Sequence, residues 1–441
     1  MKNRERLGSR LGFIMLSAGC AIGCGNVWKF PWMCGQNGGG SFMLLYIICL
    51  VVLGLPAMTM EFSVGRAAQA SPIHMYQKLE KPGYKWGIFG IASLIGNIAL
   101  MAFYTVVTGW MVYYFWKFLT GDIEGLGFVN MITNPAVNVG FLAITVAIGF
   151  FVLTFQLQGG LERVTKYMMM LLLALMLVLA VVSGMQPGAV EGYRFYLVPD
   201  FTKIGVDTIV AAMNQAFFTL SVGMGSMAIF GSYIDKERSL LGESVNVILL
   251  DSFVAIMAGL IIFPSCAAYG VEVTAGPALL FDTMAAVFKH IQGGRIWGTL
   301  FFMFMTFAAF STIIGVFENI IASCMDKWEI SRKKSSLING IIILIGSVPA
   351  VLGYNVWKGF QPRGAGSTIL DLEDFLVSNL ILPGGAIVFL LFCMTKWGWG
   401  FENYLAETNT GMGLKMPRIL RGYLTYVMPC IIFAIIILGL I

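Results

Sequence analysis

Charged residues and histidines are both scarce in this 441-residue chain. Asp, Glu, Lys and Arg make up 12% of it, whereas soluble globular proteins carry roughly 25%. Hydrophobic residues reach 58% and the mean hydropathy is +0.82, so the composition predicts an integral membrane protein. The two histidines, His74 and His290, stand alone in the sequence. They exclude a histidine-rich metal site and supply no nucleophile–base constellation, which argues against an enzyme.

Paired CxxC spacings and a signal-peptide cleavage site are also missing. The eight cysteines lie mostly within or beside apolar runs, so we expect buried apolar side chains rather than disulfides or metal ligands. The charged start, residues 2–6, resembles that of a signal peptide, but the apolar run after it is too long and no small-residue site closes it. We expect a first transmembrane helix there. The net charge of +5 sits in loops and indicates no nucleic-acid partner.

Eleven apolar runs are long enough to cross a bilayer. They are residues 11–33, 41–60, 88–116, 137–157, 167–184, 208–231, 245–269, 296–323, 337–353, 375–395 and 419–441. Lys and Arg precede the first run and recur in every second joint, so the positive-inside rule predicts a cytoplasmic N-terminus. The odd number of runs then predicts that the C-terminus is outside, in a multi-pass protein of the cell (inner) membrane. The joint at 270–294 contains an apolar stretch too short to span, from which we expect a hairpin lid on the outer face.

The first apolar run contains residues that a spanning helix normally avoids. Gly19, Gly23 and Gly25 each cost roughly 1 kcal/mol of helix propensity relative to Ala, and the polar Asn26 and Lys29 follow them. Irregular backbone survives in lipid only where it is buried in protein or lines a watery cavity. The run therefore predicts an interrupted helix whose free backbone groups bind ions or a charged substrate. Close helix packing by small residues is the alternative.

A second interruption is predicted in the sixth run, at residues 214–226, which again combine a Gly-x-Gly with polar side chains. Matching interruptions in two halves are typical of transporters with an inverted repeat and a site at mid-membrane depth. Two chance glycine pairs would give the same pattern. We expect a first repeat at residues 1–184 (spans 1–5), a second at 185–395 (spans 6–10), and a cytoplasmic loop with span 11 at 396–441.

Several motifs along nearly the whole chain resemble those of the neurotransmitter:sodium symporter family, especially its bacterial amino-acid transporters. They are Gly19-x-x-Ile22-Gly23-x-Gly25-Asn26-x-x-Lys29-Phe30-Pro31, Asn37-Gly38-Gly39-Gly40, Pro56, Glu61-Phe62-x-x-Gly65-Arg66, Phe217-Phe218-Thr219-Leu220-Ser221 and Gly276-Pro277-Ala278-Leu279-Leu280-Phe281. The resemblance implies an all-α polytopic membrane protein, with a five-plus-five inverted repeat, unwound helices 1 and 6, and an eleventh helix. It also implies that sodium entry drives uptake of a small amine-bearing substrate.

The resemblance implies a substrate site at the two interruptions. Monoamine transporters carry Asp at the position of Gly23, so Gly23 indicates a substrate with its own carboxylate, held near Gly25 and Tyr104. The ammonium group is expected at the Ala21, Phe218 and Thr219 carbonyls and the Ser221 hydroxyl. A side-chain subsite without fixed charge favours neutral, hydrophobic L-amino acids. The full set is Ala21, Gly23, Cys24, Gly25, Leu100, Phe103, Tyr104, Phe218, Thr219, Ser221, Met224, Thr312 and Val316.

Two co-transported sodium ions are also implied. The first site resembles one built from Ala21, Asn26, Thr219 and Asp251 with the carboxylate of the substrate, and the second one built from Gly19, Ile22, Ala308, Ser311 and Thr312. Chloride-dependent relatives have Asn at the position of Asp251 and Ser at that of Ala255. Because a fixed carboxylate can replace the charge of a mobile anion, we predict transport without chloride.

The resemblance further implies two gates. Lys29 and Asp374 resemble the outer ion pair, with Phe218 and Tyr104 beneath it. The family usually has Arg at the position of Lys29, and Lys cannot make the bidentate fork, so we expect a looser outer gate. The inner gate resembles the pair Arg4 and Asp326, supported by Tyr233, and Glu61 resembles a Glu that braces the unwound part of span six. Leu7 and Met170 depart from the family pattern.

The sequence thus predicts a sodium-coupled importer that works by alternating access in the lipid bilayer. Its cargo would be a small-molecule amino acid, and its assembly a monomer or weak homodimer. A proton-coupled permease of the same fold, with Glu61 or Asp251 as the proton carrier, is the alternative. A channel or a polytopic enzyme belongs to another class, and uptake that saturates would separate a transporter from a channel.

Overall fold

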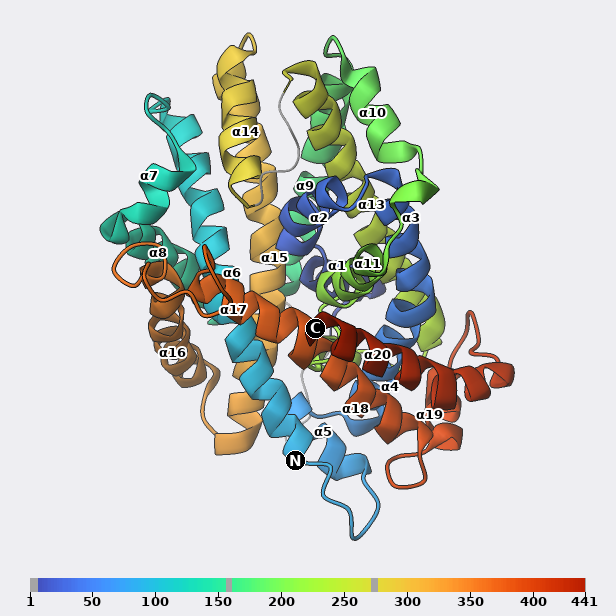
Figure 1. Ribbon diagram of the computed structural model, residues 1–441. Coiled ribbons are helices and arrows are strands. Elements are labelled where there is room, and N and C mark those ends of the chain that lie inside the picture. Colours follow the sequence, from blue (N-terminus) through green and yellow to red (C-terminus); the bar gives the residue numbers. More distant parts are fainter. Residues whose placement is uncertain (1–6, 156–160, 271–276, 441) are drawn as a thin grey trace.

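A computed structural model describes residues 7–155, 161–270 and 277–440, and its regular structure there is helical (Figure 1). The first half contains α1 (Arg10–Ala21), η1 (Gly25–Lys29), α2 (Phe30–Gln36), α3 (Gly40–Cys49), η2 (Leu50–Gly54), α4 (Leu55–Ala68), α5 (Pro72–Leu79), α6 (Ile88–Thr120), α7 (Phe128–Thr133), α8 (Pro135–Leu153), α9 (Arg163–Gly184) and α10 (Ala189–Leu197). The second half contains η4 (Phe201–Lys203), α11 (Val206–Thr219), α12 (Ser226–Gly231), α13 (Leu240–Ala268), α14 (Pro277–His290), α15 (Gly294–Trp328), α16 (Arg332–Leu352), α17 (Ile369–Phe375), η5 (Leu376–Ile381), α18 (Leu382–Met394), α19 (Phe401–Thr408), η6 (Arg418–Leu420), η7 (Tyr423–Val427) and α20 (Met428–Leu440).

Within the described residues, each of the eleven predicted apolar runs lies in helix over most of its length. Nine form continuous helices long and apolar enough to cross a membrane, one forms the bent pair α1 and η1–α2, and one forms the interrupted pair α11 and α12. Several helices are longer than predicted: α6 continues to Thr120 and α15 to Trp328. Their polar ends continue the helical hydrogen-bond pattern beyond the apolar run, and an apolar run alone does not predict such an extension.

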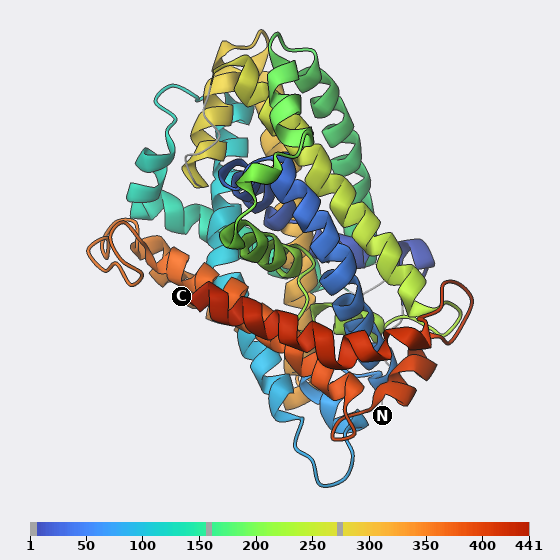
Figure 2. The ribbon, with the colours of Figure 1, turned by 45° about the vertical axis from the view of Figure 1, so that its right-hand side comes forward.

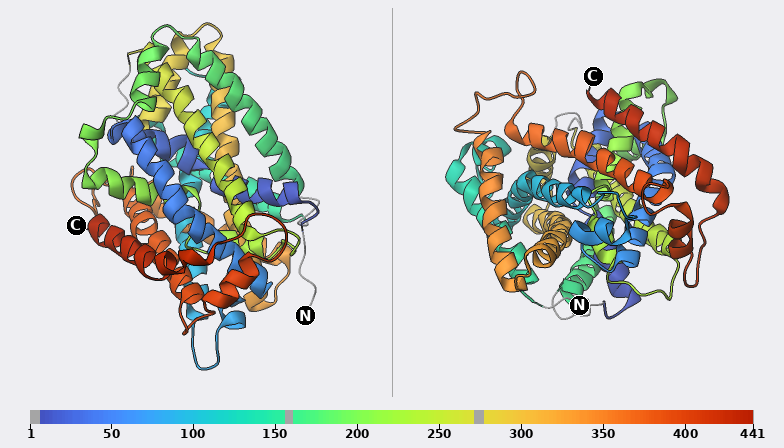
Figure 3. Two further views of the ribbon diagram at one scale, coloured as in Figure 1. Left: turned by 90° about the vertical axis from the view of Figure 1, so that its right-hand side faces the viewer. Right: turned by 90° about the horizontal axis from the view of Figure 1, so that it is seen from below.

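The helices form a bundle with α6 and α15 packed against each other at its centre. The apolar stretch of α15 is 83% buried, whereas that of the last span is only 22% buried because it covers the outside of the bundle along α18 (Figures 2 and 3). The short helix α14 lies at the end of the molecule opposite to α5 (Figure 1). It matches the apolar stretch predicted as an outer lid, although residues 271–276 lie outside the described residues.

The predicted interruptions are confirmed in both spans. The chain leaves the helix at Ile22, whose backbone is extended, and the axis bends by 49° between α1 and the segment Gly25–Gln36. Between α11 and α12, Ser221, Gly223 and Gly225 have positive φ angles of 50°, 104° and 73°. A side chain on Gly223 would also collide with the backbone of Leu382. Glycine is required here because the backbone conformation and the space both exclude a larger residue.

Glu61 of α4 stabilises the second interruption. Its carboxylate accepts hydrogen bonds from the backbone N–H groups of Gly223 (2.5 Å) and Met227 (3.0 Å). These N–H groups belong to the unwound segment and the first turn of α12, which have no helical partner for them. The contacts are those expected for a brace of span six.

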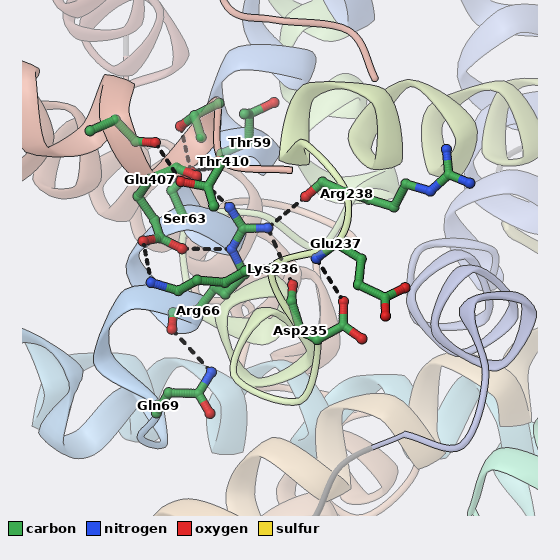
Figure 4. Close-up of polar contacts among 12 residues, drawn as sticks. Thr59, Ser63, Arg66, Gln69, Asp235, Lys236, Glu237, Arg238, Glu407 and Thr410 are labelled. Carbon is green, nitrogen blue, oxygen red and sulfur yellow. Dashed lines mark hydrogen bonds and ion pairs between the residues drawn. The ribbon is translucent and has the colours of Figure 1, made fainter. Parts of the chain in front are cut away.

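A second buried charge, Arg66, holds the end of α4 in place (Figure 4). Its side chain is 1% exposed and donates to the Glu407 carboxylate (2.6 Å) and to the backbone carbonyls of Glu407, Arg238 and Asp235. Lys236 forms a further ion pair with Glu407 at 3.2 Å. The cluster therefore joins α4, the loop after α12 and α19, three segments far apart in the sequence.

Replacing Arg66 tests this cluster. Removing one partner of a buried ion pair costs about 3–5 kcal/mol because the other charge stays buried, so Arg66→Gln should lower the melting temperature of the purified protein clearly. The matched control is Arg418→Gln, since Arg418 is 70% exposed in its pair with Glu402 and such pairs contribute about 0–1 kcal/mol. Equal melting temperatures for the two variants would contradict the role given to Arg66.

Candidate functional site

The two interruptions lie against each other inside the bundle. The Ser221 hydroxyl donates to the Cys20 carbonyl at 3.3 Å, and Gln215 Nε2 donates to the Gly25 carbonyl at 2.7 Å. All residues from 212 to 233 except Asn214 are buried, and so are those from 16 to 31. The predicted site residues on these two segments are thus brought together in one enclosed region.

Gly23 faces two hydroxyl groups at very short range. A Cβ atom on Gly23 would overlap both Thr312 Oγ1 of α15 and Tyr104 Oη of α6. The neighbouring backbone N–H of Cys24 donates to Tyr104 Oη at 2.6 Å. Tyr104 is therefore fixed beside the start of η1, where the helix dipole favours an anion. The arrangement suits a carboxylate, and any side chain at position 23 would disrupt the arrangement of the two hydroxyl groups.

Asp251 of α13 is the centre of a buried polar cluster. Its carboxylate accepts from Asn26 Nδ2 (2.8 Å), from the Thr219 hydroxyl (3.1 Å) and from the Tyr46 hydroxyl (3.3 Å). Asn26 also accepts from the Gly23 N–H at 3.0 Å, so the cluster is bonded directly to the carboxylate cradle. Asp251 is 0% exposed, and in the described part of the chain no Lys or Arg pairs with it. A buried carboxylate without a cationic partner is costly, and a bound cation would offset its charge.

A second group of oxygen atoms lies between α1 and α15. The Ser311 hydroxyl lies 2.8 Å from the carbonyl oxygens of both Ile22 and Ala308 and can donate to either one. The Thr312 hydroxyl donates to the Ile22 carbonyl at 3.2 Å. A Cβ on Gly19 would lie 3.4 Å from Ser311 Cβ, so Gly19 borders the same group. All five residues predicted for the second sodium site therefore meet here. Their atoms are carbonyl and hydroxyl oxygens, the ligand type that a hard cation prefers.

The side chains predicted for the side-chain subsite are apolar and buried. The rings of Phe103 and Phe218 stack with centroids 6.5 Å apart, and Leu100, Met224 and Val316 are at most 3% exposed. Asn97, which the sequence analysis did not single out, donates to the Met224 carbonyl at 2.8 Å and fixes this turn of the unwound segment.

The expected outer pair is formed. Lys29 Nζ lies 2.6 Å and 2.8 Å from the two carboxylate oxygens of Asp374, and 4.1 Å from the centre of the Phe218 ring. It donates to a third oxygen, the hydroxyl of Ser378, at 2.9 Å. Ser378 also donates to Asp374 at 2.8 Å, so the three side chains form one closed unit above Phe218.

The expected inner pair is described only in part. Arg4 lies outside the described residues, and Asp326 accepts hydrogen bonds from the backbone N–H and the hydroxyl of Ser71. The Tyr233 hydroxyl donates to Glu318 at 2.7 Å, and Glu318 forms a bidentate pair with Arg332 at 2.7 Å and 2.9 Å. These contacts give partners to Glu318, for which the sequence had suggested none. Support of the inner pair by Tyr233 stays a prediction.

Four polar residues of the site were missed from the sequence. They are Tyr46, Gln215, Ser378 and Asn97. The available signal was a polar side chain inside an apolar run, which marks the residue as expensive in lipid but does not identify its partner. The described residues contain no cluster of three or more His, Cys, Asp or Glu suited to a metal ion, in keeping with sites built from backbone and hydroxyl oxygens.

Comparisons with known proteins agree with this architecture. The family model described as the sodium:neurotransmitter symporter family matches residues 4–126 and 126–441. An uncharacterised sodium-dependent transporter of Bacillus subtilis is 34% identical over 91% of this chain and 90% of its own, and one of Haemophilus influenzae is 31% identical over 100% and 99%. The crystal structure of MhsT in complex with L-phenylalanine superimposes with a TM-score of 0.90 at 33% identity, covering 99% of both chains. The chain belongs to the sodium:neurotransmitter symporter family and is a sodium-dependent symporter.

Proposed function

We propose that this symporter imports neutral, hydrophobic L-amino acids. The observation that carries the proposal is the cradle at Gly23, where no side chain fits between Tyr104 and Thr312. A substrate that brings its own carboxylate would offer an acceptor to the Tyr104 and Thr312 hydroxyl groups that occupy this space, whereas an amine without a carboxylate would not. The adjoining side chains of Leu100, Phe103, Phe218, Met224 and Val316 are apolar, so a charged substrate side chain would be buried there without a partner. The similar MhsT structure holds L-phenylalanine, which has this chemistry.

Two sodium ions accompany the substrate in this proposal. One binds at Asp251, Asn26 and Thr219, with the Ala21 carbonyl and the substrate carboxylate, and the other at Ser311 and its neighbours. Asn26 contacts both Asp251 and the Gly23 N–H, so the first ion and the carboxylate share one hydrogen-bonded unit. Each then raises the affinity for the other by the same factor, which is the physical basis of coupling.

The transport cycle follows from the two gates. Lys29 and Asp374 close the outer side, and Arg4 and Asp326 the inner side, while spans 1, 2, 6 and 7 rock against the rest. The chain sits in the cell (inner) membrane with its N-terminus in the cytoplasm and its C-terminus outside, as a monomer or weak homodimer.

A binding and uptake screen tests the proposed function. Purified protein is tested against the twenty amino acids with and without sodium, and uptake into proteoliposomes is then driven by a sodium gradient at clamped pH. Neutral hydrophobic L-amino acids should bind only with sodium, and their uptake should saturate. Binding confined to charged amino acids would refute the assigned substrate class. Uptake that follows a proton gradient and ignores sodium would favour the proton-coupled alternative.

Gly23→Ala tests the cradle. The added methyl group overlaps the positions of Tyr104 Oη and Thr312 Oγ1, so the substrate carboxylate loses its hydrogen bonds. Two such bonds to a charged group contribute about 1.5–3 kcal/mol each, so the affinity should fall by at least roughly 100-fold. Gly140→Ala is the matched control, because a Cβ there meets nothing within 4 Å. Isothermal titration with the best substrate from the screen measures both; an unchanged affinity for Gly23→Ala would remove the cradle from the site.

Asp251→Asn tests the fixed charge. The variant keeps an oxygen that can accept from Thr219 but removes the negative charge that attracts the cation. Because an interaction with a charged group contributes about 1.5–3 kcal/mol, the sodium concentration for half-saturation should rise at least about tenfold. Asp207→Asn removes the same charge from an exposed position at the start of α11 and should leave the sodium dependence unchanged.

Independence of chloride is tested on the wild-type protein, whose uptake should persist when gluconate replaces chloride. A collapse of uptake in gluconate would refute chloride independence.

A further inference from the structure

A cavity of about 360 Å³ lies at the end of the molecule where α5 joins α6, away from the substrate site. It is lined by Ile73, Gln77, Glu80, Lys85, Gly87, Ile88, Ile91 and Lys327. These residues come from α5, the loop after it, the first turns of α6 and the last turn of α15. We call it the α5–α6 pocket.

Two unpaired positive charges line the α5–α6 pocket. Lys85 and Lys327 are exposed, and neither forms a hydrogen bond or ion pair with another residue that the structure describes. The one carboxylate of the lining, Glu80, is turned to the start of α6, where Oε2 accepts from the backbone N–H groups of Trp86 (2.5 Å) and Gly87 (3.2 Å). The positive end of the helix dipole offsets its charge, so the pocket presents a net positive surface.

A second wall of the pocket is apolar and continues along α6, which is long and apolar enough to span a membrane. Ile88 and Ile91 are 66% and 45% exposed, and Ile95, one further turn along α6, is 60% exposed. Residues at this spacing lie on one face of a helix, so the three form a stripe that faces lipid. Trp328, 59% exposed beside Lys327, is the type of residue that marks a membrane–water interface. The pocket therefore combines cationic groups with an acyl-chain path.

We propose that the α5–α6 pocket binds an anionic phospholipid, with its phosphate between Lys85 and Lys327 and one acyl chain along Ile88, Ile91 and Ile95. Basic pockets between helices at the membrane surface are suited to such head groups. A soluble anion would use the two lysines but not the apolar stripe, and a zwitterionic lipid would use the stripe but bring no net charge. Only an anionic lipid uses both walls.

The bound lipid would contact the segment that carries the expected inner gate. Lys327 directly follows Asp326, whose carboxylate accepts from Ser71 at the start of α5. His74 of α5 lies with Nε2 3.3 Å from the Asp326 carbonyl. A head group on Lys85 and Lys327 thus connects the loop before α6 with the last turn of α15, next to the start of α5 that contacts Asp326.

Photo-cross-linking tests the pocket directly. The purified full chain is incubated with phosphatidylglycerol that carries a photoreactive group on one acyl chain, and the labelled residues are mapped by mass spectrometry. Labels should appear within residues 88–95 and be displaced by unlabelled phosphatidylglycerol, but not by phosphatidylcholine or inorganic phosphate. Displacement by inorganic phosphate, or equally by phosphatidylcholine, would overturn the proposal.

A pair of double variants separates this pocket from general surface charge. Each lysine near an anionic lipid contributes roughly 5-fold in affinity, so Lys85→Gln with Lys327→Gln should weaken labelling at 88–95 by roughly 25-fold. Lys333→Gln with Lys334→Gln removes the same charge from exposed positions at the start of α16 and should leave it unchanged. Equal labelling of the two double variants would overturn the proposal. This readout needs no transport, so it stands apart from the proposed substrate.

Discussion

The structure depends on one constraint: every backbone N–H and C=O group within the lipid needs a partner inside the protein. Two spans break this ladder at mid-length, and polar side chains from neighbouring helices supply the missing partners. The Glu61 carboxylate accepts hydrogen bonds from the N–H groups of Gly223 and Met227, and the Gln215 side chain donates to the Gly25 carbonyl. Irregular backbone therefore persists at this depth because it is buried in protein, where neighbouring side chains bond to it.

Charge balance supports the proposal that this site binds a cation and a zwitterion together. Asp251 is buried and held by three neutral donors, so its negative charge is solvated but not neutralised. A sodium ion beside it, as proposed, would restore neutrality. The proposed amino-acid substrate would add a carboxylate near the start of η1 and an ammonium group near the carbonyls, and so would bring no net charge.

Features that depend only on residues close together in the sequence could be predicted. The apolar runs and both interruptions are local signals. A long apolar run predicts a membrane-spanning segment, and glycines combined with polar residues inside that run predict a break in its helix. The five residues proposed for the second sodium site were predicted from family motifs, and the structure brings them together. The contacts of Tyr46 with Asp251 and of Tyr233 with Glu318 could not be predicted, since each joins helices separated by many residues. The sequence shows that a polar side chain lies within an apolar run and needs a partner, whereas the identity of that partner depends on how the helices pack.

The departure at Lys29 shows how packing decides the meaning of a substitution. An ammonium group has three N–H donors and lacks the planar fork of a guanidinium, so a carboxylate alone cannot satisfy it as well as it satisfies Arg. Here Ser378 supplies the third acceptor, one turn from Asp374 on the same span. The ammonium also lies over the Phe218 ring, whose face attracts a cation. All three N–H donors of Lys29 thus have acceptors, and one of these acceptors is a serine hydroxyl that the family's Arg–Asp pair gave no reason to expect.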